Sequence, residues 1–549
     1  MSWSAPGRVL MIYSDGHRAD ALRWLPVFRT RDVRVIGPDG PPADGPLTTQ
    51  ATYRQATTSD EIAHAARAFG PVDLVVDMQL NTTFAELRGS WKRLGLEVVE
   101  GGYFAAVRLR PAGQAWDNQR RDPILQRWRN QLKPDDPALD VSSRHALDAE
   151  LADPIVNLPH AVLVRKQGVD LALLRDDEIS LVESREPGTT VGLLAELPAG
   201  ELHSTRTIRS HGTTKTVYGL DTSMSYPPAT LRHYTGSLVF RGRTLLTSGH
   251  TVLPDSFRFF HAPFPKHPAL RDVAQGYGRL STSLEPTDEL SGTFFVLDAQ
   301  WTGHFGHIMT ETVPRLWGWD EARHRFPDLK ALYMAKPDDD VDPVVSRLLT
   351  AYGIDPADQV VVHGPVKLSS AICASALVHN ATPHFVRPEL AGIWRRIGDA
   401  LADPDAPVYE RIFVARPHSG YVRTCRNAPD VEAVFVRHGF QLVRPDQLEL
   451  AMQVGIFRGP RIVAGFAGSG MFNAMYTDKL EHLIVLAHDS YLARHENKFA
   501  AVHDADVDYF WSESDTKHGK HFDVNAFLSD WVFDFETNGA ALEELLSNL

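Results

Sequence analysis

The stretch Arg411–Asn473, RIFVARPHSGYVRTCRNAPDVEAVFVRHGFQLVRPDQLELAMQVGIFRGPRIVAGFAGSGMFN, decides the fold that we expect for this chain. Its three short apolar runs predict strands over Arg411–Ala415, Phe440–Val443 and Arg461–Gly465. Two segments with apolar residues at helical spacing separate these strands, and the glycine-rich turn Phe466–Gly470 opens a third helix. Strands that alternate with helices of this length form parallel sheets with right-handed crossovers. The sequence therefore predicts a parallel α/β unit here.

The two helices of this stretch have recognisable start and stop residues. Pro429 falls in the first turn of the first helix, where a missing N–H costs nothing, and Gly439 ends that helix. Asp446 followed by Glu449 resembles a capping box for the second helix, which runs to about Arg458. These boundaries place the carboxyl ends of the strands, which is where ligands bind in parallel sheets.

Arginines and glycines gather at those carboxyl ends. Arg416, Arg423 and Arg426 follow the first strand, and Phe466–Gly470 follows the third. The N-terminus of a helix offers unpaired N–H groups and a positive dipole end, and arginine offers paired donors for phosphate. We therefore expect this unit to hold a phosphorylated ligand. The residues alone also allow a structural turn with solvated surface arginines.

This pattern resembles the family 61 glycosyltransferases, which include bacterial capsular-polysaccharide proteins and the eukaryotic O-linked GlcNAc and xylosyl transferases. The residues that follow the order of the family are Arg416, Arg423, Asn427, Gly439, Phe440, Gln453, Gly465, Gly468, Gly470 and Asn473. Upstream, the run from His304 through His307 and Glu311 to Pro314-Arg315 matches the family's Asn-x-x-His-x-x-x-Glu-x-x-Pro-Arg. The resemblance covers about residues 225–515. It implies an α/β fold with a GT-B-like pair of Rossmann-type lobes that face one another.

Three positions depart from the family pattern. His304 stands in place of the asparagine of the upstream block, Ala428 in place of a glutamate, and Ala467 in place of the histidine of the glycine turn. The family has polar side chains there, which are suited to contact substrate. These departures leave the expected fold intact and open a second reading, an inactive relative that binds a nucleotide or glycan as a scaffold.

Sugar transfer from a nucleotide requires stabilisation of the leaving diphosphate and removal of a proton from the acceptor hydroxyl. The candidate donor-binding residues are Arg416, Arg423, Asn427, Gly465, Gly468, Ser469, Gly470 and Asn473. For the base we turn to a helix predicted from about His304 to His324. His307 and Glu311 are four residues apart and share one face of that helix.

We expect His307 to be the base and Glu311 its orienting partner, with the two roles exchangeable. His304 and Arg315 extend the same face and are candidates for the acceptor side or for a supporting layer. A helix whose His–Glu–Arg face only forms structural ion pairs is the alternative.

No metal site and no cofactor beyond the nucleotide-sugar substrate are expected. Asp338-Asp339-Asp340 contains the Asp-x-Asp pattern of metal-dependent transferases, yet it follows a strand and precedes a helix, where helix capping explains it equally well. GT-B enzymes, moreover, generally work without a metal, as the resemblance implies.

The whole chain sets broad limits on function. Its 549 residues allow several domains, and 43% apolar residues is ordinary for a globular protein. A net charge of −13 argues against general affinity for nucleic acid. Two cysteines, Cys373 and Cys425, form no framework and fit a reducing cytoplasm. We see no signal peptide and no membrane-spanning stretch, so a lipid-linked acceptor would require peripheral contact with the membrane.

We expect four segments along the chain. Residues 1–110 form a small α/β domain, 111–160 a charged helical linker, 161–405 a β-rich lead-in with the first lobe on the acceptor side, and 406–549 the nucleotide-sugar lobe with a tail. The first segment weakly resembles class I methyltransferases in its closing half, where Leu96–Glu100 and Tyr103–Arg110 are predicted as two strands split by two glycines. Ser14-Asp15-Gly16-His17 replaces the glycine-rich cofactor loop of that family. Packing or recognition is thus expected of this domain, with methyl transfer from S-adenosylmethionine as an alternative.

The family resemblance implies an inverting, metal-independent glycosyltransferase of polysaccharide or capsule biosynthesis. The acceptor would be a glycan or a lipid-linked glycan. The sequence leaves open the sugar, the nucleotide, the acceptor, the linkage and the oligomeric state.

Overall fold

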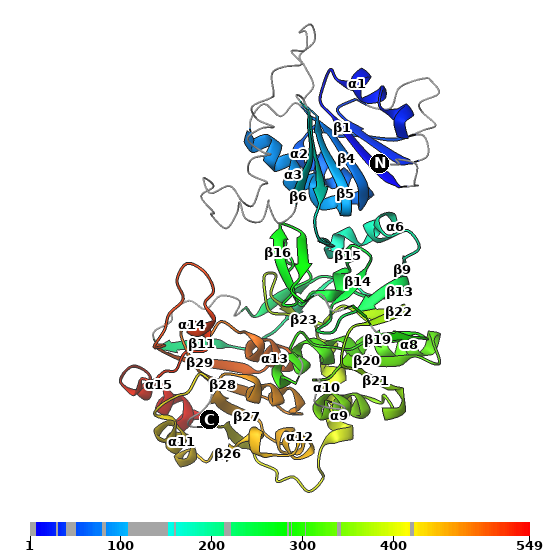
Figure 1. Ribbon diagram of the computed structural model, residues 1–549. Coiled ribbons are helices and arrows are strands. Elements are labelled where there is room, and N and C mark those ends of the chain that lie inside the picture. Colours follow the sequence, from blue (N-terminus) through cyan, green and yellow to red (C-terminus); the bar gives the residue numbers. More distant parts are fainter. Residues whose placement is uncertain are drawn as a thin grey trace.

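The structure is a computed structural model that describes residues 7–28, 31–39, 51–79, 84–107, 152–158, 161–212, 221–282, 285–286, 288–301, 303–336, 342–417 and 422–549. Within these ranges, three large sheets succeed one another from one end of the molecule to the other (Figure 1). Helices accompany each sheet, so the expectation of a mixed α/β fold is confirmed.

The N-terminal unit is a seven-stranded sheet in the order β3-β2-β1-β4-β5-β7-β6. The strands β3, β2, β1, β4 and β5 run parallel to one another, and β7 is antiparallel to its neighbours β5 and β6. Leu87 and Trp91 of the helix α3 and Phe69 of the helix α2 are buried in the core on one face of the sheet. The elements are β1 (Arg8–Tyr13), α1 (Arg18–Leu22), β2 (Asp32–Gly37), β3 (Thr52–Gln55), α2 (Ser59–Phe69), β4 (Val72–Met78), α3 (Phe84–Leu94), β5 (Val98–Val107), β6 (Ala152–Leu158) and β7 (Ala161–Lys166).

Two expectations for this region differ from the structure. The part of the expected helical linker 111–160 that is described, β6, is a strand, and β7 also completes this sheet, so the unit extends beyond residue 110. The two strands expected on either side of Gly101 are one continuous strand, β5. Gly101 adopts a φ of 77°, which lets the backbone absorb the irregular pairing with β4 without ending the strand.

Buried polar contacts join this unit to the second sheet. Arg185 lies 2.9 Å from Glu97, and Tyr277 donates a hydrogen bond to the same carboxylate. Arg67 pairs with Glu178 at 2.9 Å and also donates to the carbonyl oxygen of Leu173 at 2.6 Å. These pairs fix the N-terminal unit against the middle of the molecule.

The middle of the chain forms a twelve-stranded sheet, in which β22, β19, β20 and β21 run parallel to one another. Its strands are β8 (Leu171–Leu173), β9 (Thr190–Leu197), β13 (Ala229–Phe240), β14 (Leu246–Ser248), β15 (Thr251–Val252), β16 (Leu270–Ala274), β17 (Tyr277–Leu280), β18 (Asp288–Leu290), β19 (Phe294–Val296), β20 (Lys330–Met334), β21 (Gln359–Val362) and β22 (Val366–Ala374). The helices of this region are α6 (Val182–Arg185), α7 (Phe305–His307), α8 (Trp319–Arg325), α9 (Pro343–Tyr352) and α10 (Leu390–Leu401). Two small antiparallel sheets of two strands each are also present, β10 (Gly200–His203) with β12 (Ser223–Tyr226) and β23 (Val378–His379) with β24 (Phe385–Val386).

The helix expected from His304 to His324 is helical but irregular. It consists of α7, a π-helical segment Ile308–Thr312, a 3-10 segment Val313–Gly318 and α8. Pro314 lacks an N–H donor, which is one reason why a regular α-helix does not continue through this region.

The third sheet is wholly parallel, in the order β11-β29-β28-β27-β25-β26. From β25 the chain passes to β26 on one side and then to β27 on the other, so the strand order reverses between β25 and β27. Its elements are β11 (Ile208–Gly212), β25 (Arg411–Val414), α11 (Ala428–Arg437), β26 (Gln441–Val443), α12 (Leu450–Arg458), β27 (Ile462–Phe466), β28 (His482–His488), α13 (His495–His503), β29 (Asp506–Ser512), α14 (Val524–Phe527) and α15 (Phe535–Asn548).

The three strands and two helices predicted over Arg411–Asn473 are confirmed, but the predicted capping box is wrong. Asp446 lies in a separate 3-10 turn, Pro445–Gln447, and α12 begins at Leu450 with no side-chain cap from Glu449. One continuous apolar core joins the second and third sheets. It includes, for example, Phe295 of β19 and Val485 of β28. None of the helices in the described part of the chain combines the length and apolar character needed to cross a bilayer.

Candidate functional site

The glycine turn after β27 lies against two arginines of the loop after β25. Gly468 adopts a φ of 144°. A Cβ atom at this position would lie 2.9 Å from Nη1 of Arg416 and 3.3 Å from Nη2 of Arg423. The positive φ favours glycine here, and the missing side chain leaves the backbone of this turn close to both guanidinium groups. Strand order reverses at this point, and such switch points form ligand crevices in parallel sheets.

Both arginines are held in place by backbone carbonyl groups and aromatic rings. Arg416 donates to the carbonyl oxygens of Ala467 at 2.9 Å and Val422 at 3.0 Å. The guanidinium of Arg423 lies 5.4 Å from the ring centroids of Tyr491 and Phe527. Among the residues that the structure describes, neither arginine forms an ion pair. Burial, together with the like charge of Arg423, lowers the pKa of Arg416 to about 10.

The buried carboxylate of Glu496 holds the glycine turn through a hydrogen bond from its backbone. Glu496, at the start of α13, accepts hydrogen bonds from the N–H of Gly468 at 3.0 Å and from the hydroxyl of Tyr491 at 2.8 Å. Burial raises the pKa of Glu496. Its second oxygen, Oε2, is buried and has no hydrogen-bond partner in the structure. Nothing in the sequence pattern marked this residue, because α13 is far from the glycine turn along the chain.

His307 and Glu311 form the pair that their spacing predicted. Nδ1 of His307 lies 2.5 Å from Oε1 of Glu311, which also lies 3.0 Å from Nε of Arg258. The backbone N–H of Gln300 donates to the other carboxylate oxygen at 2.7 Å. Burial acts to raise the pKa of Glu311, but the hydrogen bond from His307 and the charge of Arg258 outweigh it and hold that pKa below its ordinary value.

The contact fixes which atoms of the two side chains face each other. Glu311 is almost fully buried, and its lowered pKa favours the carboxylate, which can only accept from Nδ1 of His307. In the neutral ring with its proton on Nδ1, the other nitrogen would be the acceptor. Glu311 sits in the π-helical segment Ile308–Thr312, a local distortion that is common at functional sites.

His304 and Arg315 lie on either side of this pair. The rings of His304 and His307 pack edge to face with 4.9 Å between their centroids. Burial, then the charges of His307 and Arg423, lower the pKa of His304, so the charge of Arg423 reaches this ring. Arg315 is buried and donates to the backbone carbonyl oxygen of Glu311 at 2.6 Å, which places it behind the pair.

The histidine helix and the glycine turn are in direct contact. A Cβ atom on Gly306 would lie 3.0 Å from Cβ of Ser469 and 3.3 Å from the ring of Phe472. The structure thus brings the arginine pair, the glycine turn and the His307–Glu311 pair into one region, although they come from two different sheets.

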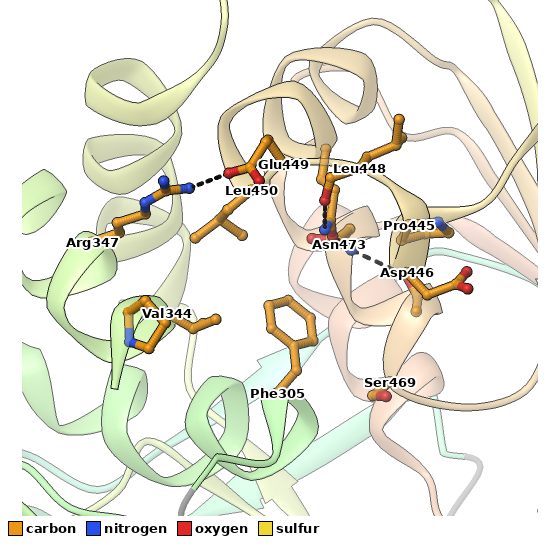
Figure 2. A pocket seen from close by; sticks show the side chains of 13 residues that line it. Phe305, Val344, Arg347, Pro445, Asp446, Leu448, Glu449, Leu450, Ser469 and Asn473 are labelled. Carbon is orange, nitrogen blue, oxygen red and sulfur yellow. Dashed lines mark hydrogen bonds and ion pairs between the residues drawn. The ribbon is translucent and has the colours of Figure 1, made fainter. Parts of the chain in front are cut away.

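A cavity of about 500 Å³ opens beside the turn (Figure 2). Its walls come from α7 and α9 of the second sheet and from the segments after β26 and β27 of the third. The lining residues include Phe305, Val344, Arg347, Pro445, Asp446, Leu448, Glu449, Leu450, Gln453, Ser469, Gly470 and Asn473. Figure 2 shows Arg347 and Glu449 paired across the two halves, with 2.8 Å between their charged atoms. Asn473 donates to Gln453 at 3.2 Å, and its buried Oδ1 has no partner.

The remaining candidate residues have structural contacts. Asn427 uses both ends of its amide on the backbone of Phe533, at 2.8 and 2.9 Å. A Cβ atom on Gly465 would lie 2.7 Å from the carbonyl oxygen of Val414, so this glycine allows β25 and β27 to pack closely. Arg426 pairs with Asp515 instead of joining Arg416 and Arg423.

In the described ranges, no group of three or more histidine, cysteine, aspartate or glutamate side chains could hold a metal ion. The run Asp338-Asp339-Asp340 lies outside those ranges. Cys373 and Cys425 are buried and unbonded to each other.

Comparison with known proteins supports the resemblance seen in the sequence. Residues 305–484 match the family model Glycosyltransferase 61. This range contains His307, Glu311, both arginines and the glycine turn. No curated protein sequence matches the chain.

Solved structures of a methyltransferase also match part of the chain. They are the MycE methyltransferase from the mycinamycin biosynthetic pathway, in two crystal forms with Mg and SAH and in a complex with Mg, SAH and mycinamycin VI. Identity is 18–20%, the TM-score is 0.22, and the match covers 30% of this chain. The chain spans only 45–46% of the length of those proteins. A TM-score this low carries no argument about fold or activity.

Proposed function

We propose that this protein is an inverting glycosyltransferase that moves a sugar from a nucleotide-sugar donor to a glycan or lipid-linked glycan acceptor. The observation that carries the proposal is the contact between the helix of His307 and the glycine turn that faces Arg416 and Arg423. A site for an anionic leaving group and a site for a base lie side by side. The match of residues 305–484 to Glycosyltransferase 61 supports the same class of reaction.

In this proposal the donor lies along the boundary of two GT-B-like lobes. The nucleoside occupies the cavity of about 500 Å³ beside Phe305 and Leu450, whose size and apolar walls suit a base and a ribose. Ser469 and Gly470 line the same cavity, so the diphosphate reaches the glycine turn, the start of the following 3-10 helix and the two guanidinium groups. In this proposal the unpartnered Oδ1 of Asn473 accepts a hydrogen bond from the nucleoside.

The reaction needs one bond to form and one to break. An acceptor hydroxyl attacks the anomeric carbon from the face opposite the diphosphate, and the bond from that carbon to the diphosphate oxygen breaks. The proton of the hydroxyl passes to the free ring nitrogen of His307, which Glu311 and Arg258 hold in orientation. The electron pair leaves with the diphosphate, where Arg416 and Arg423 stabilise the added charge.

The wider setting follows the same proposal. The protein acts in the cytoplasm in polysaccharide or capsule synthesis without a metal ion, and a lipid-linked acceptor reaches it through peripheral contact with the membrane. The nucleotide is bound by the third sheet and the acceptor by the second. The N-terminal unit serves packing or recognition.

One observation favours a second candidate, a nucleotide- or glycan-binding scaffold without turnover. The N–H of Gly468, which a phosphate could accept from, already donates to Glu496. Ala428 and Ala467 add to this reading, because the family has polar side chains at both positions.

Hydrolysis of uridine, guanosine and cytidine diphosphate sugars by the full chain separates the two candidates. His307→Ala is expected to lower turnover about 10²- to 10⁴-fold, the usual contribution of a general base. His203→Ala is the matched control, because the His203 side chain is 73% exposed. Nucleotide binding with no turnover in the unmodified protein would favour the scaffold.

A further inference from the structure

A solvent-exposed tryptophan stands next to the proposed base. Trp301 is 50% exposed, which is unusual for so large an apolar side chain. Its ring centroid lies 6.2 Å from that of His307. An exposed indole offers a flat apolar face with a polar edge, which is the surface that the C–H groups of a sugar ring pack against.

An arginine is placed at this indole by a turn that costs conformational energy. The guanidinium of Arg243 lies 5.4 Å from the centre of the Trp301 ring. Gly242, Arg243 and Thr244 have consecutive φ values of 76°, 53° and 70°. Positive φ is unfavourable for arginine and more so for β-branched threonine, and such strain persists only where the surroundings enforce it.

Three buried groups enforce this turn. The carboxylate of Asp298, which is 3% exposed, accepts a hydrogen bond from the N–H of Thr244 at 3.3 Å. The hydroxyl of Thr244 donates to the carbonyl oxygen of Ser256 at 2.6 Å, and the ring of His267 donates to the carbonyl oxygen of Arg243 at 2.7 Å. The fold thus holds the backbone of Arg243 firmly while the side chain itself is exposed.

The guanidinium of Arg243 is exposed and available to a ligand. Within the described part of the chain, no carboxylate forms an ion pair with it. Lys336 lies against Gly303, two residues along the chain from Trp301, since a Cβ atom on Gly303 would lie 2.6 Å from its Cε. An exposed cation beside an exposed aromatic ring, in a chain whose net charge is −13, favours an anionic ligand.

We propose that Trp301 and Arg243 form the acceptor subsite, in which a pyranose ring packs on the indole and an acidic group of that sugar pairs with the guanidinium. This inference rests on the proposed function, because the nearby ring of His307 makes the bound sugar an acceptor. It narrows the acceptor from any glycan to one with a carboxylate or a phosphate near the reacting hydroxyl.

Saturation-transfer NMR titrations of the full chain with three probes test this subsite. The probes are methyl β-glucuronide, glucose 1-phosphate and neutral methyl β-glucoside. We expect the acidic probes to bind about three- to tenfold more tightly than the glucoside, as a charge-assisted hydrogen bond would provide. The better of the two acidic probes identifies carboxylate or phosphate as the natural group.

Two variants and two matched controls sharpen the test. Arg243→Gln is expected to abolish the preference for acidic probes, and Trp301→Ala to weaken all three probes about fivefold or more, with partial rescue by Trp301→Phe. Arg325→Gln and Trp24→Ala, at exposed positions elsewhere, are expected to bind like the unmodified protein. Equal binding of acidic and neutral probes, or wild-type binding by Trp301→Ala, would overturn the subsite.

Donor hydrolysis measured in parallel separates this inference from the proposed function. Hydrolysis without discrimination among the probes overturns the acidic-acceptor subsite and leaves sugar transfer in place. Discrimination without any hydrolysis overturns sugar transfer and leaves a binding site for acidic sugars at Trp301.

Discussion

The N-terminal sheet and the C-terminal sheet are both built from parallel strands and helices, yet their strand ends differ. In the N-terminal unit, the buried carboxylate of Asp77 accepts hydrogen bonds from Gln79 and from the hydroxyl of Ser90. The ring of Tyr13 fills the space over Gly37, where a Cβ atom would lie 2.1 Å from it. Among the described residues, the carboxylate at the end of β4 and the space over the end of β2 are thus occupied by the protein itself.

At the C-terminal sheet, the two arginines beside the glycine turn donate to backbone carbonyl oxygens or pack on aromatic rings. Arg416 and Arg423 are packed tightly without ion pairs in the described ranges, and Gly468 keeps the backbone next to them free of a side chain. The comparison teaches that a parallel sheet does not make a binding site by itself. In our proposal, the arginines without ion pairs at the point where strand order reverses provide one. The alternative of methyl transfer by the N-terminal unit gains no support from its described geometry.

Removing both arginines is the strongest way to break this contrast. Arg416→Ala with Arg423→Ala removes charge-assisted hydrogen bonds worth about 1.5–3 kcal/mol each, so we expect nucleoside diphosphate affinity to fall more than about a hundredfold. Isothermal titration calorimetry measures the change. Arg54→Ala, in the N-terminal cavity of about 310 Å³, is the matched control and is expected to leave that affinity as it was. An equal loss of nucleoside diphosphate affinity in the double variant and in Arg54→Ala would contradict the distinction between the two sheets.

A substitution at the junction of the N-terminal unit should lower the unfolding free energy and leave nucleotide affinity unchanged. Arg185→Met leaves the buried carboxylate of Glu97 without its cation, which costs about 3–5 kcal/mol of unfolding free energy. Urea denaturation measures this loss, and calorimetry on the same variant is expected to show unchanged nucleotide affinity. A stable variant that cannot bind nucleotide would contradict a purely structural role for this junction.

Glu311→Gln tests the division of roles at the base. A glutamine amide can donate to Nδ1 of His307 and so favour the wrong tautomer, and we expect kcat to fall roughly a hundredfold. The nucleotide dissociation constant is expected to stay the same, since Glu311 is buried against His307 and Arg258 and has no contact with the donor in this proposal. The matched control is Glu321→Gln on the exposed face of α8. A variant with full kcat would show that Glu311 only supports the fold.

The smallest effect concerns pH and the junction pair Arg67–Glu178. Burial acts to raise the pKa of Glu178, but Arg67 outweighs it and lowers that pKa below the ordinary 4.5. The pair therefore stabilises the folded state above pH 4.5, by about 1 kcal/mol, and loses this contribution as pH falls through the lowered value. The difference in unfolding free energy between the unmodified protein and Glu178→Gln should shrink below pH 4.5. A constant difference would contradict this account.

The sequence predicted local features well and tertiary partners poorly. The strands and helices over Arg411–Asn473 were readable because apolar periodicity and glycine stops are local signals, and the His307–Glu311 pair follows from helical spacing. Arg258 and Glu496 were missed because they reach the site from distant segments and belong to no motif. The sequence analysis placed β6 in a helical linker and β7 in the following β-rich segment. The strands of a parallel sheet carry no local signal that two antiparallel strands will join its edge later in the chain.

The central claim is that a diphosphate binds between the arginine pair and the glycine turn, next to His307. A crystal structure of the full chain soaked with uridine, guanosine or cytidine diphosphate tests this directly. We expect the phosphates within hydrogen-bonding distance of Arg416, Arg423 and the backbone of Ser469–Gly470, with the base in the cavity beside Phe305. A nucleotide bound elsewhere, for example at the strand ends of the N-terminal sheet, with these arginines unoccupied, would contradict the account.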